Sequence, residues 1–187
     1  KDFVNDHLYV GSYLMLASLT LAPAFFLSFY KDKNKSSTNL YNKNITRSYF
    51  EFVIEPRFLQ ALTSATLAYV VMAFLMTATP ISMHIIHNLS LEKTGLVIQF
   101  HVLSMFLPSL FTGNLIKKFG YSKMIYTGVI FYILTIVLSL FEPTFLNYLL
   151  ALIFLGIGWN FLFVSGTSLL VTTYKPEEKF KAQGFND

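Results

Sequence analysis

The sequence predicts an all-α membrane protein, a polytopic helical bundle with five transmembrane helices. Three observations lead to this fold class. Of the 187 residues, 54% are hydrophobic and only 13% are charged, whereas a soluble domain carries about 25% charged residues. Five apolar runs approach or exceed the roughly 20 residues that a spanning helix needs. None of these runs contains Asp, Glu, Lys or Arg.

The five runs are joined by connectors of very unequal length. The runs cover residues 8–30, 58–86, 95–116, 124–141 and 145–173. Residues 31–57 form the one long linker, which is polar and rich in Asn, Lys and Ser. Its last part, SYFEFVIEPRF, is expected to form a short amphipathic segment at the membrane interface. Glu142-Pro143-Thr144 is a tight turn, so the last two helices are antiparallel neighbours.

Basic residues alternate between the two sides of the predicted bundle. Twelve of the 14 Lys and Arg residues fall in the linker 31–57, the connector 117–123 and the tail after residue 174. The remaining connectors hold only Lys1 and Lys93. Five spans place the three basic segments on one side, and the positive-inside rule makes that side cytoplasmic. The net charge of +4 therefore reflects membrane topology, and we expect no nucleic-acid partner.

Three side chains deep in the predicted spans are candidates for a solute path. His101 and Asn160 are costly at membrane depth unless they face a cavity or a partner. Each has two open interpretations, a lining residue of a solute path or a structural hydrogen bond between helices. Trp159 lies too deep for an interfacial belt and is either a packing residue or a stacking surface for a flat solute. Gln99 falls nearly opposite His101 and cannot face the same cavity.

Two prolines interrupt the predicted spans. Pro80 and Pro108 each leave a backbone carbonyl without its helical partner, so each is expected to kink its helix. Such a kink is either purely structural or a hinge in a moving bundle.

Signatures of catalysis and cofactor binding are absent from the sequence. The chain contains no cysteine, no GxxxxGK[ST], no GxSxG and no HExxH. The pair His84 and His87 has no carboxylate nearby, so we expect no metal site. No carboxylate pair lies in the membrane, and His101 is the one candidate acid at depth. We predict no catalytic residues, no cofactor and no enzyme activity.

One connector resembles a known family motif. The stretch GNLIKKFGYSK, residues 113–123, resembles the G-x-L-x-D-R-x-G-R-R loop of the major facilitator superfamily, which joins the second and third helices of each half on the cytoplasmic side. The positions that fit are Gly113, Leu115, Lys118, Gly120 and Lys123. Lys117 replaces the acidic residue, and Tyr121 replaces the first arginine after the second glycine. We expect the glycines to allow a tight turn between close helix ends.

Other segments extend the resemblance to one bacterial branch of this superfamily. They are TATP at 77–80, residues 98–113, residues 156–170 and residues 174–187. The resemblance implies that the chain is a fragment of a twelve-helix protein. Residues 1–30 then correspond to the last helix of the N-terminal half, residues 31–57 to the central cytoplasmic loop, and residues 58–187 to the first four helices of the C-terminal half.

The resemblance also implies a function. It predicts a secondary transporter in a bacterial inner membrane that moves a small organic solute by alternating access, with proton coupling as an option. The branch includes proteins similar to riboflavin importers, which makes a flat, riboflavin-like solute the candidate. The family's cavity-facing helices carry, in this chain, Thr77, His101, Trp159 and Asn160. The expected partners are the lipid bilayer, the solute and the missing N-terminal half. The alternative is a polytopic membrane enzyme or assembly protein whose catalytic part is missing.

Overall fold

A computed structural model describes residues 10–29 and 47–186, and these residues form helices and turns without any strand. The chain divides into two units, residues 1–42 and 43–187, and each is described by itself. The first unit contains α1 (Val10–Ser28), a 19-residue helix with Pro23 inside it and no charged residue. It corresponds to the first predicted span. Most of the predicted linker lies outside the described residues.

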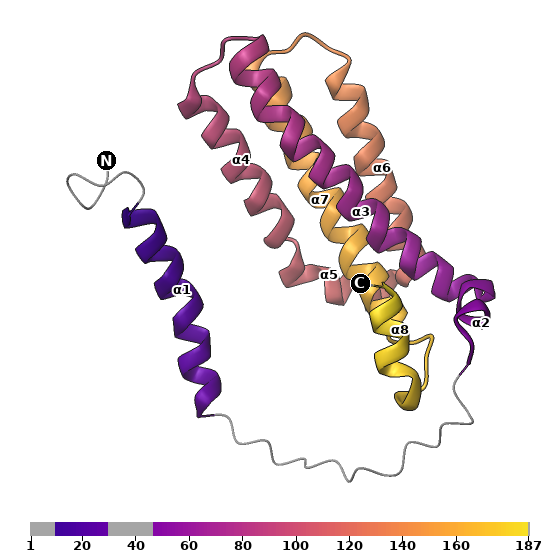
Figure 1. The fold of residues 1–187 in the computed structure, drawn as a ribbon. Helices are drawn as coiled ribbons and strands as arrows, with labels where there is room; N and C mark the ends of the chain where they lie inside the picture. Colours follow the sequence, from indigo (N-terminus) through magenta and orange to yellow (C-terminus); the bar gives the residue numbers. More distant parts are fainter. Residues whose placement is uncertain (1–9, 30–46, 187) are drawn as a thin grey trace. The chain divides into compact units, whose positions relative to one another are not determined.

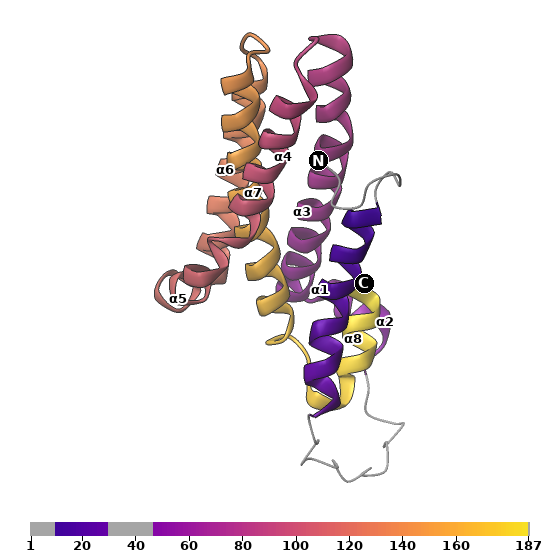
Figure 2. The same cartoon turned by 90° about the vertical axis from the view of Figure 1, so that its left-hand side faces the viewer.

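The second unit is a bundle of long helices with short helices at one end (Figures 1 and 2). Its elements are α2 (Tyr49–Ile54), α3 (Pro56–Pro80), a π-helical turn (Ile81–Ile86), α4 (Leu91–Phe106), α5 (Ser109–Phe119), α6 (Tyr121–Ser139), α7 (Phe145–Leu170), a 3-10 turn (Pro176–Glu178) and α8 (Lys179–Asn186). In both views α2, α5 and α8 lie toward the same end of the bundle. The prediction of an all-α bundle is confirmed.

Three of the described helices are long and apolar enough to cross a membrane. They are α3 with its π-helical turn, α6 and α7. A fourth span results if α4 and α5, which are bent by 41° at their junction, count as one. The predicted run 95–116 is therefore broken at Pro108, as its proline predicts. Pro80 ends α3, and the helix continues as a π-helical turn.

The turn between α5 and α6 is shorter than the sequence led us to expect. Gly113 and Lys118 both lie inside α5, so the glycine at 113 does not shape the turn. Gly120 alone forms it, with φ of 86° and ψ of 161°, a conformation that other residues rarely adopt. Lys123 lies in the first turn of α6. Lys118 and Lys123 thus lie on either side of the single glycine that forms the turn, and Gly113 lies in the middle of α5.

Helix α7 is the centre of the bundle, because α3, α4 and α6 all pack against it. Three of its glycines each approach a different neighbour. A Cβ atom on Gly156 would lie 2.7 Å from the carbonyl oxygen of His101 in α4. One on Gly158 would lie 2.7 Å from Cδ1 of Tyr132 in α6, and one on Gly166 would lie 3.0 Å from the carbonyl oxygen of Ala61 in α3. Small residues therefore permit the close helix contacts.

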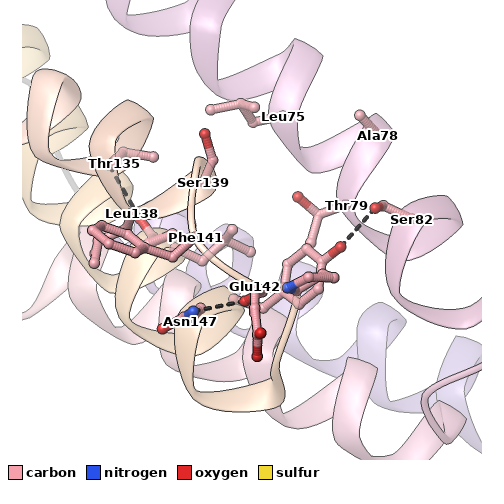
Figure 3. A pocket seen from close by; sticks show the side chains of 14 residues that line it. Leu75, Ala78, Thr79, Ser82, Thr135, Leu138, Ser139, Phe141, Glu142 and Asn147 are labelled. Atoms are coloured by element: carbon pink, nitrogen blue, oxygen red, sulfur yellow. Dashed lines mark hydrogen bonds between the residues drawn. The ribbon is translucent and has the colours of Figure 1, made fainter. Parts of the chain in front are cut away.

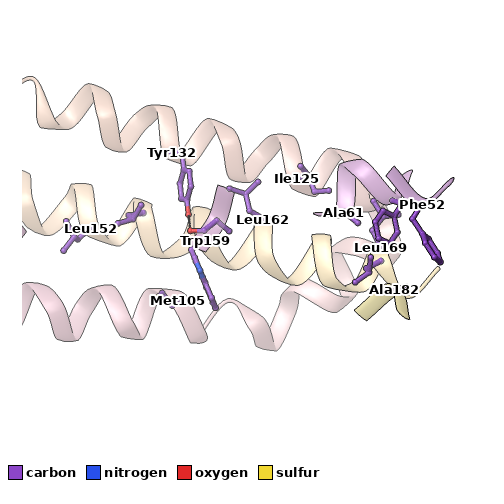
Figure 4. Packing of buried hydrophobic residues seen from close by; sticks show 14 of the residues in the cluster. Phe52, Ala61, Met105, Ile125, Tyr132, Leu152, Trp159, Leu162, Leu169 and Ala182 are labelled. Atoms are coloured by element: carbon purple, nitrogen blue, oxygen red, sulfur yellow. Dashed lines mark hydrogen bonds between the residues drawn. The ribbon is translucent and has the colours of Figure 1, made fainter. Parts of the chain in front are cut away.

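The buried apolar side chains follow α7 along its length (Figure 4). Leu152, Trp159, Leu162 and Leu169 come from this helix, and each is at most 6% exposed. Phe52 of α2 extends the same cluster at the end where α8 lies. Many apolar side chains on the outer faces of the helices remain exposed, as expected for helices that contact lipid or further helices.

Gly156→Ala is expected to destabilise the protein, because the added methyl group meets the backbone of α4 and the two helices must separate. Overpacking of this kind costs about 1–3 kcal/mol. Gly113→Ala is the matched control, since no heavy atom lies within 4 Å of a Cβ atom built there. This control is expected to be neutral or stabilising, because alanine favours a helix by about 1 kcal/mol over glycine. Thermal unfolding in detergent measures both, and equal midpoints would contradict the packing argument.

Candidate functional site

His101 is completely buried in α4 and bridges to α7. Its Nδ1 atom lies 2.8 Å from the carbonyl oxygen of Leu152, so the Nδ1–H group donates across the interface. The other ring nitrogen, Nε2, has no hydrogen-bond partner among the described residues. The contact to Leu152 matches the interpretation of His101 as a structural hydrogen bond between helices. Gln99 is exposed on a different face, as the helical periodicity predicts.

Asn160 is also completely buried, and its side chain bridges α7 to the bend between α4 and α5. Its Nδ2 group donates to the carbonyl oxygen of Met105 at 2.7 Å and to Oγ of Ser109 at 2.5 Å. The hydroxyl of Thr112 lies 2.6 Å from Oδ1 of Asn160. Met105 belongs to the last turn of α4, where carbonyl groups lack intrahelical partners. Asn160 therefore supplies hydrogen bonds that the broken helix does not.

Trp159 belongs to a group of four aromatic residues that we call the aromatic cluster, formed by Tyr69 of α3, Phe106 of α4, and Trp159 and Phe163 of α7. Trp159 stacks on Phe163, with ring centroids 4.8 Å apart and an angle of 15° between the rings. The edge contacts to Tyr69 and Phe106 measure 5.8 and 6.3 Å. Trp159 is 6% exposed, and its indole N–H has no acceptor among the residues described.

The aromatic cluster reaches from the interior to the surface. Tyr69 is 49% exposed and Phe106 is 61% exposed, although both touch the buried indole. The exposed ring of Tyr69 comes from α3 and that of Phe106 from α4, and both contact Trp159 of α7. The cluster thus presents flat apolar faces at the surface and holds one unused hydrogen-bond donor, the indole N–H of Trp159, in its interior. Sequence reasoning did not name Tyr69 or Phe106 as solute-binding residues, because single aromatic residues do not stand out among 20 Phe and 11 Tyr.

Thr77 lies apart from these contacts. It is exposed on α3, and its hydroxyl donates to the carbonyl oxygen of Ala73 at 2.9 Å. Of the four predicted solute-binding residues, the structure brings His101, Trp159 and Asn160 to the faces where α4 and α7 meet. Their role in binding remains a prediction, as does that of Thr77.

The closely spaced histidines lie at the end opposite α2 and α8. Nδ1 of His84 lies 2.9 Å from the carbonyl oxygen of Leu89, and Nδ1 of His87 lies 2.9 Å from that of Ser82. The hydroxyl of Tyr148 lies 3.1 Å from the same His87 nitrogen. Within residues 10–29 and 47–186, no group of three or more His, Cys, Asp or Glu side chains could hold a metal ion.

A cavity of about 220 Å³ lies between α3, α6 and α7 (Figure 3). Several of its polar groups are engaged with one another or with the backbone. Oγ of Ser82 lies 2.7 Å from the hydroxyl of Tyr148, and Nδ2 of Asn147 donates to the carbonyl oxygen of Glu142 at 2.6 Å. Thr135 donates to Ala151 at 3.1 Å. This cavity therefore offers a ligand mainly apolar contact.

Comparison with known proteins identifies the family of this chain. The model of the Major Facilitator Superfamily matches residues 7–186. The chain belongs to the major facilitator superfamily. The resemblance seen in residues 113–123 is thereby confirmed, and the chain is a multi-pass membrane protein.

Three members of this superfamily illustrate how much of a full protein the chain represents. The riboflavin transporter RfnT of Brucella anthropi is 36% identical over 189 residues, which cover 100% of this chain and 47% of RfnT. The uncharacterized MFS-type transporters YdeG and YddS of Bacillus subtilis are 38% and 40% identical over 67% and 65% of this chain, and over 29% and 28% of their own lengths. No solved structure matches. The chain thus spans about half the length of RfnT.

Among the described residues, the one extensive ionic network lies at the end of the bundle where α2 and α8 lie. Arg47 donates from Nε to Oε1 of Glu178 at 2.9 Å and from Nη2 to Oε2 at 2.8 Å. It also donates to Glu55 at 2.5 Å and to the carbonyl oxygen of Thr173 at 2.7 Å. The guanidinium lies 4.4 Å from the ring centroid of Phe52.

The network strongly favours the charged forms of its members. Glu178 is 2% exposed, yet the hydrogen bonds from Arg47 lower the pKa of its carboxyl from 4.5 to about 2. Hydrogen bonding to Glu178 likewise raises the pKa of Arg47. The two residues are separated by 131 positions in the chain, so the pair fastens the segment before α2 to the connection between α7 and α8.

Proposed function

We propose that the complete protein is a secondary active transporter that moves a small, flat organic solute by alternating access, with riboflavin as the candidate solute. The aromatic cluster carries this proposal. An isoalloxazine ring offers flat faces for stacking and carbonyl oxygens that accept hydrogen bonds, and the indole N–H of Trp159, which is buried in this structure, has no acceptor among the described residues. The identity to the riboflavin transporter RfnT along the whole chain supports the same solute.

The same reasoning assigns the parts of the chain within the complete transporter. α1 represents the last helix of the N-terminal half, and α3 to α7 represent the first four spans of the C-terminal half. The end that carries Arg47, Lys117, Lys118 and Lys181 faces the cytoplasm of a bacterium, because basic residues favour the inner side of its membrane. Proton coupling would rest on carboxylates of the N-terminal half or on His101, because the described spans contain no Asp or Glu except Glu92, which lies in the exposed first turn of α4.

Uptake by the complete protein tests the proposal. The full-length protein in liposomes is expected to accumulate radiolabelled riboflavin, and excess unlabelled riboflavin should compete while a sugar should not. A pH gradient imposed across the same liposomes reports whether protons are coupled. Absence of riboflavin uptake by protein that is folded and inserted would overturn the assignment of the solute.

Trp159→Ala is expected to reduce riboflavin uptake about tenfold, because stacking of a flat ring on an aromatic side chain contributes about 1–3 kcal/mol. Trp159→Phe keeps a ring but loses the N–H donor, so uptake should fall to an intermediate level. Phe74→Ala is the matched control, since this aromatic residue of α3 is 71% exposed and lies outside the aromatic cluster. Uptake that is equal in the Trp159 and Phe74 alanine variants would show that the cluster only packs.

A further inference from the structure

A second cavity, of about 360 Å³, lies where α3 and α6 begin. Its walls come from three places in the chain. Arg57 and Gln60 belong to the first turns of α3, residues 119–123 form the turn into α6, and Leu169 lies near the end of α7. Two hydrogen bonds between the side chains of Gln60 and Ser122, at 3.2 and 3.3 Å, hold the starts of α3 and α6 together.

Neither of the two cations that line this cavity forms an ion pair with another described residue. Arg57 and Lys123 are exposed and stand on different helices. The ion pairs of the described residues involve Arg47 with Glu55 and Glu178, and neither of the cavity's cations takes part in one. The first turn of α6 adds positive potential, because Gly120 at its N-cap offers no side chain to the free N–H groups. The positive charges and the hydrogen-bond donors of this cavity therefore favour the binding of an anion.

The position of the cavity selects the kind of anion. Two membrane-spanning helices, α3 and α6, begin at its walls, which places it at the level of the lipid headgroups. Its wall also includes Phe119, which is 46% exposed and offers an apolar surface beside the cations. Basic pockets between spanning helices on the cytoplasmic side suit the headgroups of anionic lipids.

We propose that this cavity binds the phosphate group of an anionic phospholipid, with Arg57 and Lys123 as its two cationic contacts. Gln60 and Ser122 supply further donors and hold the two walls at their observed separation. The bound headgroup would stabilise the junction of α5 and α6 against the start of α3. The site is independent of the identity of the transported solute.

Native mass spectrometry of the full-length protein tests this proposal. The protein in a nonionic detergent is titrated with phosphatidylglycerol or with phosphatidylcholine of the same acyl chains. Preferential binding of phosphatidylglycerol is expected. In the double variant Arg57→Gln/Lys123→Gln the affinity should fall about tenfold or more, because both cations that line the cavity and contact the phosphate group are removed.

The matched control is the double variant Lys117→Gln/Lys118→Gln, which removes the same charge from exposed positions of α5 that do not line the cavity. Its affinity for phosphatidylglycerol should stay within about twofold of the parent protein, since the site itself is unchanged. Equal losses in both double variants, or equal binding of the two lipids, would overturn the proposal. An added arm with inorganic phosphate identifies the source of the anion. Phosphate that binds as tightly as phosphatidylglycerol would show a site for a free anion and would also overturn the assignment to lipid.

Discussion

Arg47→Ala is expected to lower the free energy of unfolding by about 3 kcal/mol, the low end of the cost of removing one partner from a buried ion pair, because the Arg47 side chain is itself 31% exposed. The reason is the environment of Glu178. Its carboxylate is almost fully buried and accepts hydrogen bonds from Arg47 and from the backbone N–H of Lys175. Without the guanidinium, the buried negative charge keeps only the hydrogen bonds from the backbone N–H groups of residue 47 and Lys175. Thermal and denaturant unfolding of the full-length protein in detergent measures the loss.

The ion pair of Arg47 and Glu178 should also make the stability of the protein depend on pH. The pKa of Glu178 is about 2 in the folded protein and 4.5 when unperturbed. A carboxyl group with a lowered pKa stabilises the fold fully above its unfolded pKa, and the contribution is lost as the pH falls toward the folded value. The parent protein should therefore lose stability between about pH 4.5 and pH 2. Arg47→Ala should lose much less over this range, because Glu178 no longer carries the shifted pKa.

Two further variants separate the ion pair from general effects of charge. Arg57→Ala removes an exposed arginine that takes part in no described ion pair, so its unfolding should match that of the parent within about 0.5 kcal/mol. Arg47→Met/Glu178→Met removes both charges, and it should be less destabilised than Arg47→Ala alone because no charge stays buried. If the double variant loses as much free energy of unfolding as Arg47→Met and Glu178→Met lose together when measured singly, a direct coupling of the two residues is refuted.

The positions of the long apolar helices could be predicted from the sequence, because lipid imposes simple rules on apolar runs. Every backbone polar group must be satisfied within a helix, so an apolar run such as 145–173 has one available structure, and α7 occupies most of it. Basic connectors predicted one common side, and the described parts around α2, α5 and α8 lie toward one end of the bundle. The kink at Pro108 followed from the missing N–H group.

Features that depend on pairs of distant residues could not be predicted. Nothing local to Arg47 points to Glu178, because the pairing arises only when α7 brings its end beside α2. Gly113 belonged to a recognised turn motif, yet the helix of α5 continues through it, since the cost of one helical glycine is only about 1 kcal/mol. The aromatic cluster likewise requires three helices to converge, and its exposed members carry no individual signal.

The second large effect is expected at Asn160, where the sequence left two interpretations open. Asn160→Leu keeps the approximate volume but removes every hydrogen bond of the side chain. The carbonyl of Met105 and the hydroxyl of Ser109 each lose a partner, whereas the hydroxyl of Thr112 still donates to the carbonyl oxygen of Pro108 at 2.8 Å. Since each buried polar group left unpaired costs about 1–3 kcal/mol, we expect a total loss of about 3–5 kcal/mol and a less sharply fixed bend between α4 and α5.

Asn147→Leu provides the comparison on the same helix. Asn147 donates to the carbonyl oxygen of Glu142 at the exposed start of α7, so its replacement should cost about 1 kcal/mol or less. Measuring unfolding and riboflavin uptake together separates the two interpretations of Asn160. A structural role predicts that Asn160→Leu loses stability and uptake together. Loss of uptake with unchanged stability would instead assign Asn160 to the solute path, because the hydrogen bonds at the bend would then be dispensable for the fold.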